Sequence, residues 1–347
     1  MPVVRPDELR RIAEGTLAAA GAPADEARIV ARSLVAANLA GHDSHGVLRL
    51  PQYLAAMEAG TVVPGAAVEV VRESPVAAVL DAHWAFGQVA ATHAAEVAIA
   101  KAEAGSLAAV AVRRSAHVGR LADYVQLVAA QGMVGLMFVN GHGGAHNTVP
   151  WGGADVRLCT NPLAYALPTG GDPIVLDIST SAVAEGKVRT YHIRGVPVPD
   201  GWLVDSEGNP TNDPGVLYAK PRGGILPMGG NVGYKGFGLS LMVDLLAGAL
   251  SGAGCSGPDA ERGGNAFLII ALDPGAFAGR EQFAAEADAL LAWVKSSRLA
   301  PGAEEIVAPG EIERRQAERR RREGIPVDEE TWRQLLDAAA RAGIPMP

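Results

Sequence analysis

The chain has 347 residues, of which 48% are hydrophobic and 5% aromatic, and it carries a net charge of −8 at neutral pH. This length allows two domains, or one large domain with an added helical layer. The acidic balance argues against nucleic-acid binding, no apolar run is long enough for a membrane span, and two cysteines are too few for a disulfide framework and fit a reducing compartment.

The first 60 residues predict three helices, each followed by a glycine. Apolar residues recur at helical spacing over about 7–20, from about 25 to the glycine at 41, and over about 50–59. The opening residues form an acidic and basic helix start without an apolar signal core, so we expect no secretion signal and a cytoplasmic protein.

From residue 68 onward, β-type runs alternate with helical patterns. The expected strands are 68–71, 76–80, 107–112, 133–139, 174–176 and 267–272. The expected helices are 88–104, 120–131, 239–250, 281–297, 312–322 and 329–342. The stretch 196–232, rich in proline and glycine, predicts a long ordered loop over the core. The pattern as a whole predicts an α/β protein.

The most informative motif is the run Gly-His-Asp-Ser-His-Gly-Val-Leu-Arg at 41–49. His45 carries the side chain whose ordinary pKa lies near neutrality, so it can take and return a proton. Arg49 offers a planar fork that holds a carboxylate in one orientation. Together they are what an enzyme acting on an α-hydroxy or α-keto acid needs, although a polar connection between helices is the simpler interpretation of the run alone.

Two further polar motifs follow expected strands. His117 comes after the 107–112 strand and before a helix, where anions are favoured, although a capping turn would also explain it. Asp177, with the hydroxyl residues Ser179, Thr180 and Ser181, follows the 174–176 strand. A carboxylate there could orient an imidazole or bind a ribose hydroxyl, and helix capping is the alternative.

Glycine-rich segments bear on cofactor binding. Only five of the thirty basic residues are lysines, and Lys235 lies among the glycines of the 228–238 segment, which suits a phosphate. The 252–257 segment matches the letters of the dinucleotide fingerprint G-x-G-x-x-G, but it follows a helical pattern, whereas the real fingerprint follows a strand. We therefore reject that fingerprint and expect a fold other than the Rossmann type.

A metal site would indicate a different class of enzyme. His142 and His146 have the spacing of metal ligands on a helix, but three glycines lie in this stretch and no carboxylate or cysteine completes the set nearby. We expect no metal. The competing hypothesis is a metal-dependent lyase or aldolase that would use both histidines and Asp155 on a keto acid.

Taken in order, the motifs resemble those of the type-2 malate/L-lactate dehydrogenase family, which includes ureidoglycolate, sulfolactate, diketogulonate and piperideine-carboxylate enzymes. The similarity covers about residues 7–336. The motifs that carry it are Ser44–His45–Gly46 with Arg49 and Tyr53, His117–Val118–Gly119, Pro150–Gly153, Thr160–Ala164, Asp177–Ser181 with Gly186–Lys187, Tyr234–Leu239, Pro309–Glu311, and Gly324–Ile325.

The resemblance implies a non-Rossmann fold in which a helical layer from both ends of the chain surrounds a β-rich cofactor-binding domain. We expect residues 1–75 with 285–347 to form a helical substrate and dimerisation domain, and 76–284 to form the NAD(P)-binding α/β domain. The implied reaction interconverts a small 2-hydroxy acid and a 2-keto acid with NAD or NADP. Reduction of a cyclic imine carboxylate is the alternative within the family. A homodimer or higher homo-oligomer is implied as well.

The resemblance also assigns roles to residues. His45 would be the proton donor and acceptor, oriented by Asp177, and Arg49 would hold the substrate carboxylate. Ser44 and Tyr53 would line the substrate site, and His117 competes with His45 for the acid–base role. The residues implied to hold the dinucleotide are Asn140, His117, Asp177, Ser179, Thr180, Ser181, Lys235, Gly310 and Glu311.

Overall fold

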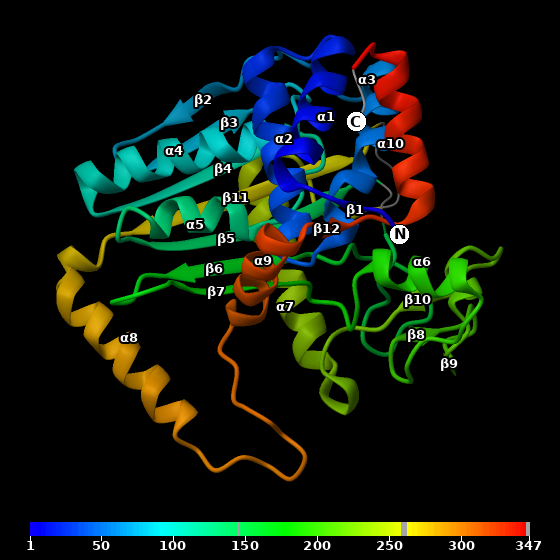
Figure 1. Cartoon of the computed structure of the whole chain (residues 1–347). Coiled ribbons are helices and arrows are strands. Elements are labelled where there is room, and N and C mark those ends of the chain that lie inside the picture. Colours follow the sequence, from blue (N-terminus) through cyan, green and yellow to red (C-terminus); the bar gives the residue numbers. More distant parts are fainter. Residues whose placement is uncertain (144–145, 258–261, 345–347) are drawn as a thin grey trace.

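The computed structural model describes residues 1–143, 146–257 and 262–344. Its centre is a seven-stranded sheet with the order β2-β3-β4-β11-β5-β6-β7 (Figure 1). All neighbouring strands in it are antiparallel except β3 and β4, which are parallel. The strands are β2 Glu69–Glu73, β3 Ala77–Asp81, β4 Leu107–Ser115, β5 Val134–His142, β6 Leu163–Leu167, β7 Ile174–Ile178 and β11 Gly264–Leu272.

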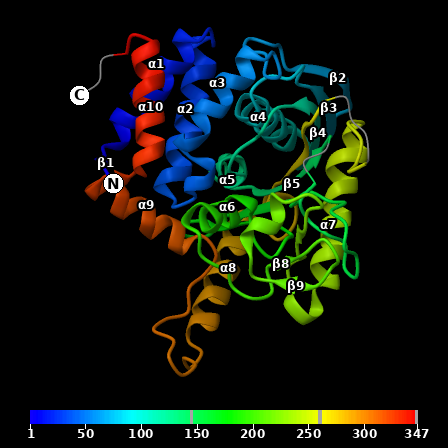
Figure 2. The same ribbon diagram turned by 90° about the vertical axis from the view of Figure 1, so that its right-hand side faces the viewer.

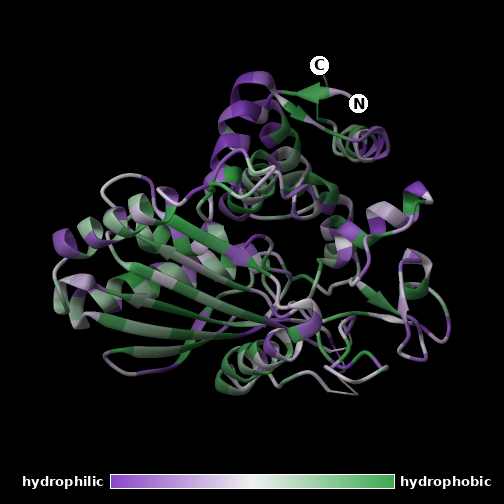
Figure 3. Ribbon diagram, turned by 90° about the horizontal axis from the view of Figure 1, so that it is seen from below, coloured by the Kyte–Doolittle hydropathy of each residue, from purple (hydrophilic) through white to green (hydrophobic). Residues whose placement is uncertain are grey.

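Helices cover both faces of this sheet because its strands alternate between two apolar sides. In β4, Val110 and Val112 belong to the cluster under α4 (Gly87–Gly105) and α5 (Ala122–Ala129). Ala111, between them, belongs to the cluster under α7 (Tyr234–Asp244), where Val243 packs. The buried side of α4 is almost entirely alanine, a strong helix former whose small side chain lets the helix lie close to the strands. Hydrophobic green follows the strands of the sheet in Figure 3.

A helical layer stands beside the sheet and is built from both ends of the chain. Helices from the two ends share one apolar cluster, and the short strands β1 (Val3–Val4) and β12 (Ile325–Pro326) pair with each other. Figure 2 shows α10 alongside α1 and α2. The helices of the layer are α1 Pro6–Ala19, α2 Ala24–Leu39, α3 Leu50–Glu58, α9 Glu311–Glu323 and α10 Glu329–Arg341.

The helix α8 (Arg280–Lys295) has no buried residue and projects away from the sheet and the layer (Figure 1). It carries exposed apolar side chains, among them Leu290 and Trp293. Nothing tests the domain division at 75 and 284, which stays a prediction.

The stretch 196–232 is more structured than expected. It contains β8 (Leu203–Val204), β9 (Pro210–Thr211) and β10 (Gly224–Ile225), which form a small sheet in the order β10-β8-β9. With α6 (Glu185–Arg194), whose start the sequence pattern indicated without its bounds, this sheet encloses its own apolar cluster around Val188, Leu203 and Ile225. The stretch is therefore a small lobe with a core, and the expectation of a plain loop was wrong.

The expected α/β architecture is confirmed, and so is the departure from the Rossmann type. A Rossmann sheet is doubly wound and mostly parallel, whereas here β11 runs antiparallel between β4 and β5. The 252–257 segment follows the helical turns of Leu245–Ala249 and not a strand, which agrees with the rejection of the dinucleotide fingerprint. Among the described residues, no helix is both long and apolar enough to cross a bilayer.

Candidate active site

Two histidines from distant parts of the chain face each other. His45 lies in the short turns that join α2 to α3, and His117 lies between β4 and α5. Their ring centroids are 5.6 Å apart and their planes differ by 19°, so the imidazoles are stacked. The structure therefore brings together the two candidates for the acid–base role.

The His45 loop is held by side chains that the sequence pattern did not reveal. The Asn38 amide donates to Asp43 Oδ1 at 2.6 Å and accepts from the Val47 N–H at 2.8 Å. Arg320 of α9 donates to both Asp43 carboxylate oxygens, at 2.7 and 3.1 Å. A Cβ on Gly46 would lie 2.2 Å from Asn38 Oδ1, so this close approach requires glycine.

Arg49 is anchored in a way that leaves part of its fork available. Its Nε donates to the Ser44 carbonyl oxygen at 2.7 Å, and its Nη1 donates to Gln52 Oε1 at 2.8 Å. In the described part of the chain, Nη2 has no hydrogen-bond partner. Ser44 Oγ lies 3.1 Å from His45 Nδ1. The predicted Ser44, His45 and Arg49 therefore form one site.

Both imidazoles are neutral at pH 7. Burial lowers the pKa of His45 to about 4, and the positive charge of Arg49 adds to that effect. Burial, followed by Arg49, also lowers the pKa of His117 well below its ordinary value. A carboxylate bound to Arg49 would offset its charge, so substrate binding would raise the pKa of both histidines.

Tyr53 and Gln88 support His117 from behind. The Tyr53 hydroxyl lies 2.8 Å from His117 Nδ1, and Gln88 Nε2 donates to the Tyr53 oxygen at 2.7 Å. Burial raises the pKa of Tyr53 to about 12, so the phenol keeps its proton. Tyr53 therefore contacts a histidine of the site. Gln88 lies among the alanines of α4, where the sequence gives no signal for such a contact.

The structure does not join Asp177 to His45. The Asp177 Oδ2 accepts from the Ala122 N–H at 2.8 Å, and no hydrogen bond links it to His45 within the described ranges. Arg120 donates to the neighbouring Asp123 at 2.9 Å. Burial raises the pKa of Asp177 and of Asp123. The role of Asp177 in orienting His45 stays a prediction.

Two of the segments predicted to hold the dinucleotide meet at the end of β7, and a third lies against the first half of this strand. The Thr180 carbonyl oxygen accepts from the Met228 N–H at 2.9 Å, and a Cβ on Gly236 would lie 2.2 Å from the Met228 oxygen. The Asp177–Ser181 segment is thus a neighbour of the segment that contains Lys235. Gly310 packs on Val175 of β7, where a Cβ would lie 3.0 Å from a backbone oxygen.

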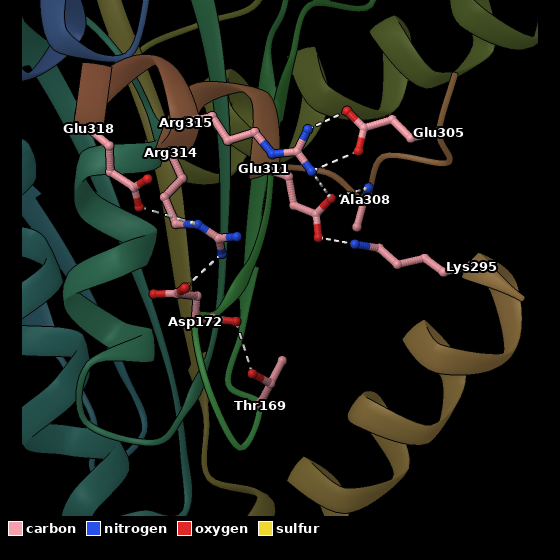
Figure 4. A network of polar contacts seen from close by, with 9 residues as sticks. All are labelled: Thr169, Asp172, Lys295, Glu305, Ala308, Glu311, Arg314, Arg315 and Glu318. Carbon is pink, nitrogen blue, oxygen red and sulfur yellow. Dashed lines mark hydrogen bonds and ion pairs between the residues drawn. The ribbon is translucent and has the colours of Figure 1, made fainter. Parts of the chain in front are cut away.

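The side chains of the residues predicted to hold the dinucleotide differ in their exposure and in their hydrogen-bond and ion-pair partners. Lys235 is exposed in the first turn of α7, whereas the hydroxyls of Ser179, Thr180 and Ser181 bond to nearby backbone or to each other. Glu311 is paired with Lys295 and Arg315 and accepts from the Ala308 N–H, as Figure 4 shows. Nothing tests a cofactor role for any of them.

Asn140 lies deeper than its predicted role suggests. It is fully buried, and its amide donates to Asp244 Oδ1 at 2.9 Å. The Asn140 carbonyl oxygen accepts from Asn265 Nδ2 at 3.1 Å, and Asn265 Oδ1 accepts from the Val118 N–H at 3.0 Å. Asn140 is thus connected through Asn265 to the His117 segment. Asn265 was not predicted, because its partners lie far away in sequence.

The three residues of the metal hypothesis, His142, His146 and Asp155, have different surroundings in the structure. His142 is the last residue of β5, with its ring centroid 6.1 Å from that of Trp84. His146 lines a cavity with Glu185, Tyr218 and Arg222. Asp155 forms an exposed ion pair with Arg157. In the described ranges, no three histidine, cysteine or acidic side chains gather as metal ligands would.

Comparison with known proteins points to one family. Residues 4–336 match the malate/L-lactate dehydrogenase family. The chain is 38% identical to hydroxycarboxylate dehydrogenase B of Escherichia coli strain K12 over 335 residues, which cover 94% of this chain and 90% of that protein.

Solved structures agree. A putative malate/lactate dehydrogenase from E. coli is 35% identical and superposes with a TM-score of 0.93 over 99% of this chain and 96% of that one. A Δ1-piperideine-2-carboxylate reductase from Pseudomonas syringae is 30% identical, with a TM-score of 0.85 over 97% of this chain and 100% of the other.

Proposed function

Because the chain belongs to the malate/L-lactate dehydrogenase family and is thus an oxidoreductase, we propose that it transfers a hydride between NAD(P)H and a small 2-keto or 2-hydroxy acid. The observation that carries this proposal is the stacked pair of neutral imidazoles, His45 and His117, beside the partly free fork of Arg49. It supplies a base, a hydrogen-bond partner and a carboxylate clamp at one place.

The segment that leads into α7 fits the phosphates of a dinucleotide. Gly229 and Gly230 have φ of 121° and 54°, conformations that favour glycine, and no described residue has an atom within 4 Å of a Cβ at Gly230. Exposed Lys235 adds positive charge at the start of an 11-residue helix. With Asp177–Ser181 and Gly310 nearby, these residues would hold the cofactor, whose nicotinamide supplies or accepts the hydride when bound.

The chain's own residues would then orient the substrate and move the proton. Arg49 binds the substrate carboxylate through its available Nη2, so that the reacting carbon is held in one orientation beside the histidines. Neutral His45 takes the hydroxyl proton of a 2-hydroxy acid during oxidation. In the reverse direction, the bound carboxylate raises the pKa of His45, which can then return the proton to the developing alkoxide.

A homodimer in the cytoplasm completes the proposal. The projecting helix α8, which has no buried residue, and the exposed apolar residues Met242 and Leu245 at the end of α7 offer surfaces that a second copy would cover. Cys159 and Cys255 form no disulfide, which is consistent with a cytoplasmic protein. Analytical ultracentrifugation measures the oligomeric state.

The test of the activity is spectroscopic. Purified protein incubated with a panel of 2-keto acids should oxidise NADH or NADPH, which is followed as loss of absorbance at 340 nm. A cyclic imine carboxylate belongs in the panel, because a structural relative is a piperideine-carboxylate reductase. Turnover that needs no nicotinamide and stops with a chelator would instead support the metal-dependent lyase.

Replacing Arg49 with lysine should raise KM for the acid strongly and lower kcat somewhat. Lysine keeps the positive charge but loses the planar guanidinium, with its Nη2 donor and the Nε contact to the Ser44 carbonyl oxygen. Steady-state kinetics on the best substrate measure the effect, and Arg28→Lys on an exposed position of α2 is the matched control. Unchanged kinetics for Arg49→Lys would remove Arg49 from the site.

Replacing Lys235 with alanine should weaken binding of NADH or NADPH by about 1–3 kcal/mol, the range for losing a hydrogen bond to a charged group. Fluorescence titration measures the affinity, with Lys220→Ala as the control for the lost charge. Gly257→Ala tests the rejected fingerprint with little strain, since the nearest atom of the described residues to its Cβ lies 3.8 Å away. Loss of binding in Gly257→Ala together with normal binding in Lys235→Ala would contradict the proposed cofactor site.

A further inference from the structure

A buried hydrogen-bond chain runs from α4 to the site and ends on His117. Gln88 of α4, Tyr53 of α3 and His117 of the segment before α5 follow one another at 2.7 and 2.8 Å. The side chains of Gln88 and Tyr53 are 1% and 4% exposed, so water does not compete for their contacts. None of the family-implied roles involves Gln88.

We propose that Gln88 and Tyr53 are positioning residues that fix His117 as the tautomer with its proton on Nε2, so that His117 can only donate a hydrogen bond to the reacting oxygen and His45 alone acts as the base. This inference rests on the proposed dehydrogenase function. It resolves the competition between the two histidines by assigning them different roles.

The tautomer of His117 follows from the number of hydrogens that the Tyr53 hydroxyl can donate. A phenol has one hydrogen to donate, and its oxygen accepts others. The Gln88 amide donates to the Tyr53 oxygen, and His117 Nδ1 is the only other hydrogen-bond partner of that oxygen within the described residues. A buried phenol hydrogen without an acceptor is costly, so the Tyr53 hydrogen points at His117 Nδ1. A nitrogen that accepts carries no proton, and the single proton of a neutral imidazole must then be on Nε2.

The protonation states of the two groups support this count. Burial raises the pKa of Tyr53 to about 12 and lowers the pKa of His117, so a tyrosinate paired with an imidazolium is disfavoured. Gly119 has φ of 75° and would place a Cβ 3.3 Å from Gln88 Nε2, so a glycine there leaves room for the amide.

His45 is under no such restriction. Its Nδ1 faces the Ser44 hydroxyl, which can rotate to donate or to accept. His45 can therefore carry its proton on either nitrogen and expose an unprotonated Nε2 to the substrate. Of the two stacked imidazoles in their neutral forms, only His45 can therefore offer an unprotonated Nε2 that takes a proton from the substrate.

The experiment reads the tautomer directly. Nitrogen-15 NMR of histidine-labelled protein distinguishes a protonated ring nitrogen from an unprotonated one, and the His117→Asn variant identifies the His117 signals by their loss. We expect a protonated Nε2 and an unprotonated Nδ1 in the wild-type protein. A protonated Nδ1 would overturn the inference, and this readout does not depend on whether the protein is a dehydrogenase.

Gln88→Glu tests the first link of the chain. An ionised carboxylate can only accept, so Tyr53 would turn to donate to it and would accept from His117 Nδ1–H instead. The tautomer of His117 in this variant should switch as the new carboxyl ionises between pH 5 and about 9.5, a range that covers the raised pKa of buried glutamates. A tautomer that stays the same throughout would remove Gln88 from the relay.

Tyr53→Phe tests the second link by kinetics. Loss of one hydrogen bond that orients His117 should lower kcat about tenfold. Tyr165→Phe on β6, where the ring packs against Phe138, is the matched control. Wild-type kcat in Tyr53→Phe would contradict the positioning role, whereas absence of activity in every protein, wild type included, would contradict the proposed function and leave the NMR result standing.

Discussion

The His45→Ala variant is expected to lose at least about 10²-fold in kcat and to bind NADH or NADPH as the wild-type protein does. The loss is the lower end of what a general acid–base group contributes. Stopped-flow and steady-state measurements at 340 nm give kcat, and fluorescence titration gives cofactor affinity. His93→Ala is the matched control, since His93 lies on α4 with its only ion pair, to Glu96, at 3.9 Å in the described structure.

Glutamine variants separate the two roles. Glutamine keeps an N–H donor but cannot act as a base near pH 7. His117→Gln should therefore retain more activity than His117→Ala, whereas His45→Gln should be as inactive as His45→Ala. If His45→Ala stays active and His117→Ala is inactive, the assignment of the base to His45 is wrong.

The Gly87→Ala variant is expected to be strongly destabilised, by about 1–3 kcal/mol or more. A Cβ at this position would lie 2.3 Å from the His117 carbonyl oxygen and 2.4 Å from that of Ala116. Both are backbone atoms, so they move only with the whole His117 segment, and kcat should fall as well. Urea unfolding followed by circular dichroism measures the change in the free energy of unfolding.

Gly238→Ala is the control for this prediction. Gly238 lies inside α7, and a Cβ there would have no atom of the described part of the chain within 4 Å, so alanine should leave the free energy of unfolding unchanged or raise it slightly. A Gly87→Ala protein as stable and as active as the wild type would show that the His117 segment can shift without loss.

The sequence was informative where chemistry is local. The run 41–49 indicated the base and the carboxylate clamp, and the structure brings Ser44, His45 and Arg49 together. Most helices begin and end within one or two residues of their expected bounds, because their apolar spacing and terminal glycines are local signals. The strand β6 was not predicted, because its first residues belong to the Thr160–Ala164 motif, whose Asn-Pro pair is typical of a turn.

Long-range partners could not be predicted from the sequence. Gln88 contacts Tyr53 across 35 residues, and Asn265 contacts Val118 across 147. A lone amide in a helix or a strand carries no pattern that indicates its partner, since the contact depends on how distant elements pack. The structure therefore adds the residues that position the histidines, whereas the sequence indicated the histidines themselves.

The clamp that Arg320 places on Asp43 has a consequence for how the protein is made. The two residues are 277 positions apart, and β1 likewise pairs with β12 in the same layer. At a synthesis rate of about 5–20 residues per second, the His45 loop waits roughly 15–55 s on the ribosome before its partner emerges. The sheet can fold during that time, but the loop that carries the proposed base reaches its final form only after nearly the whole chain has been translated.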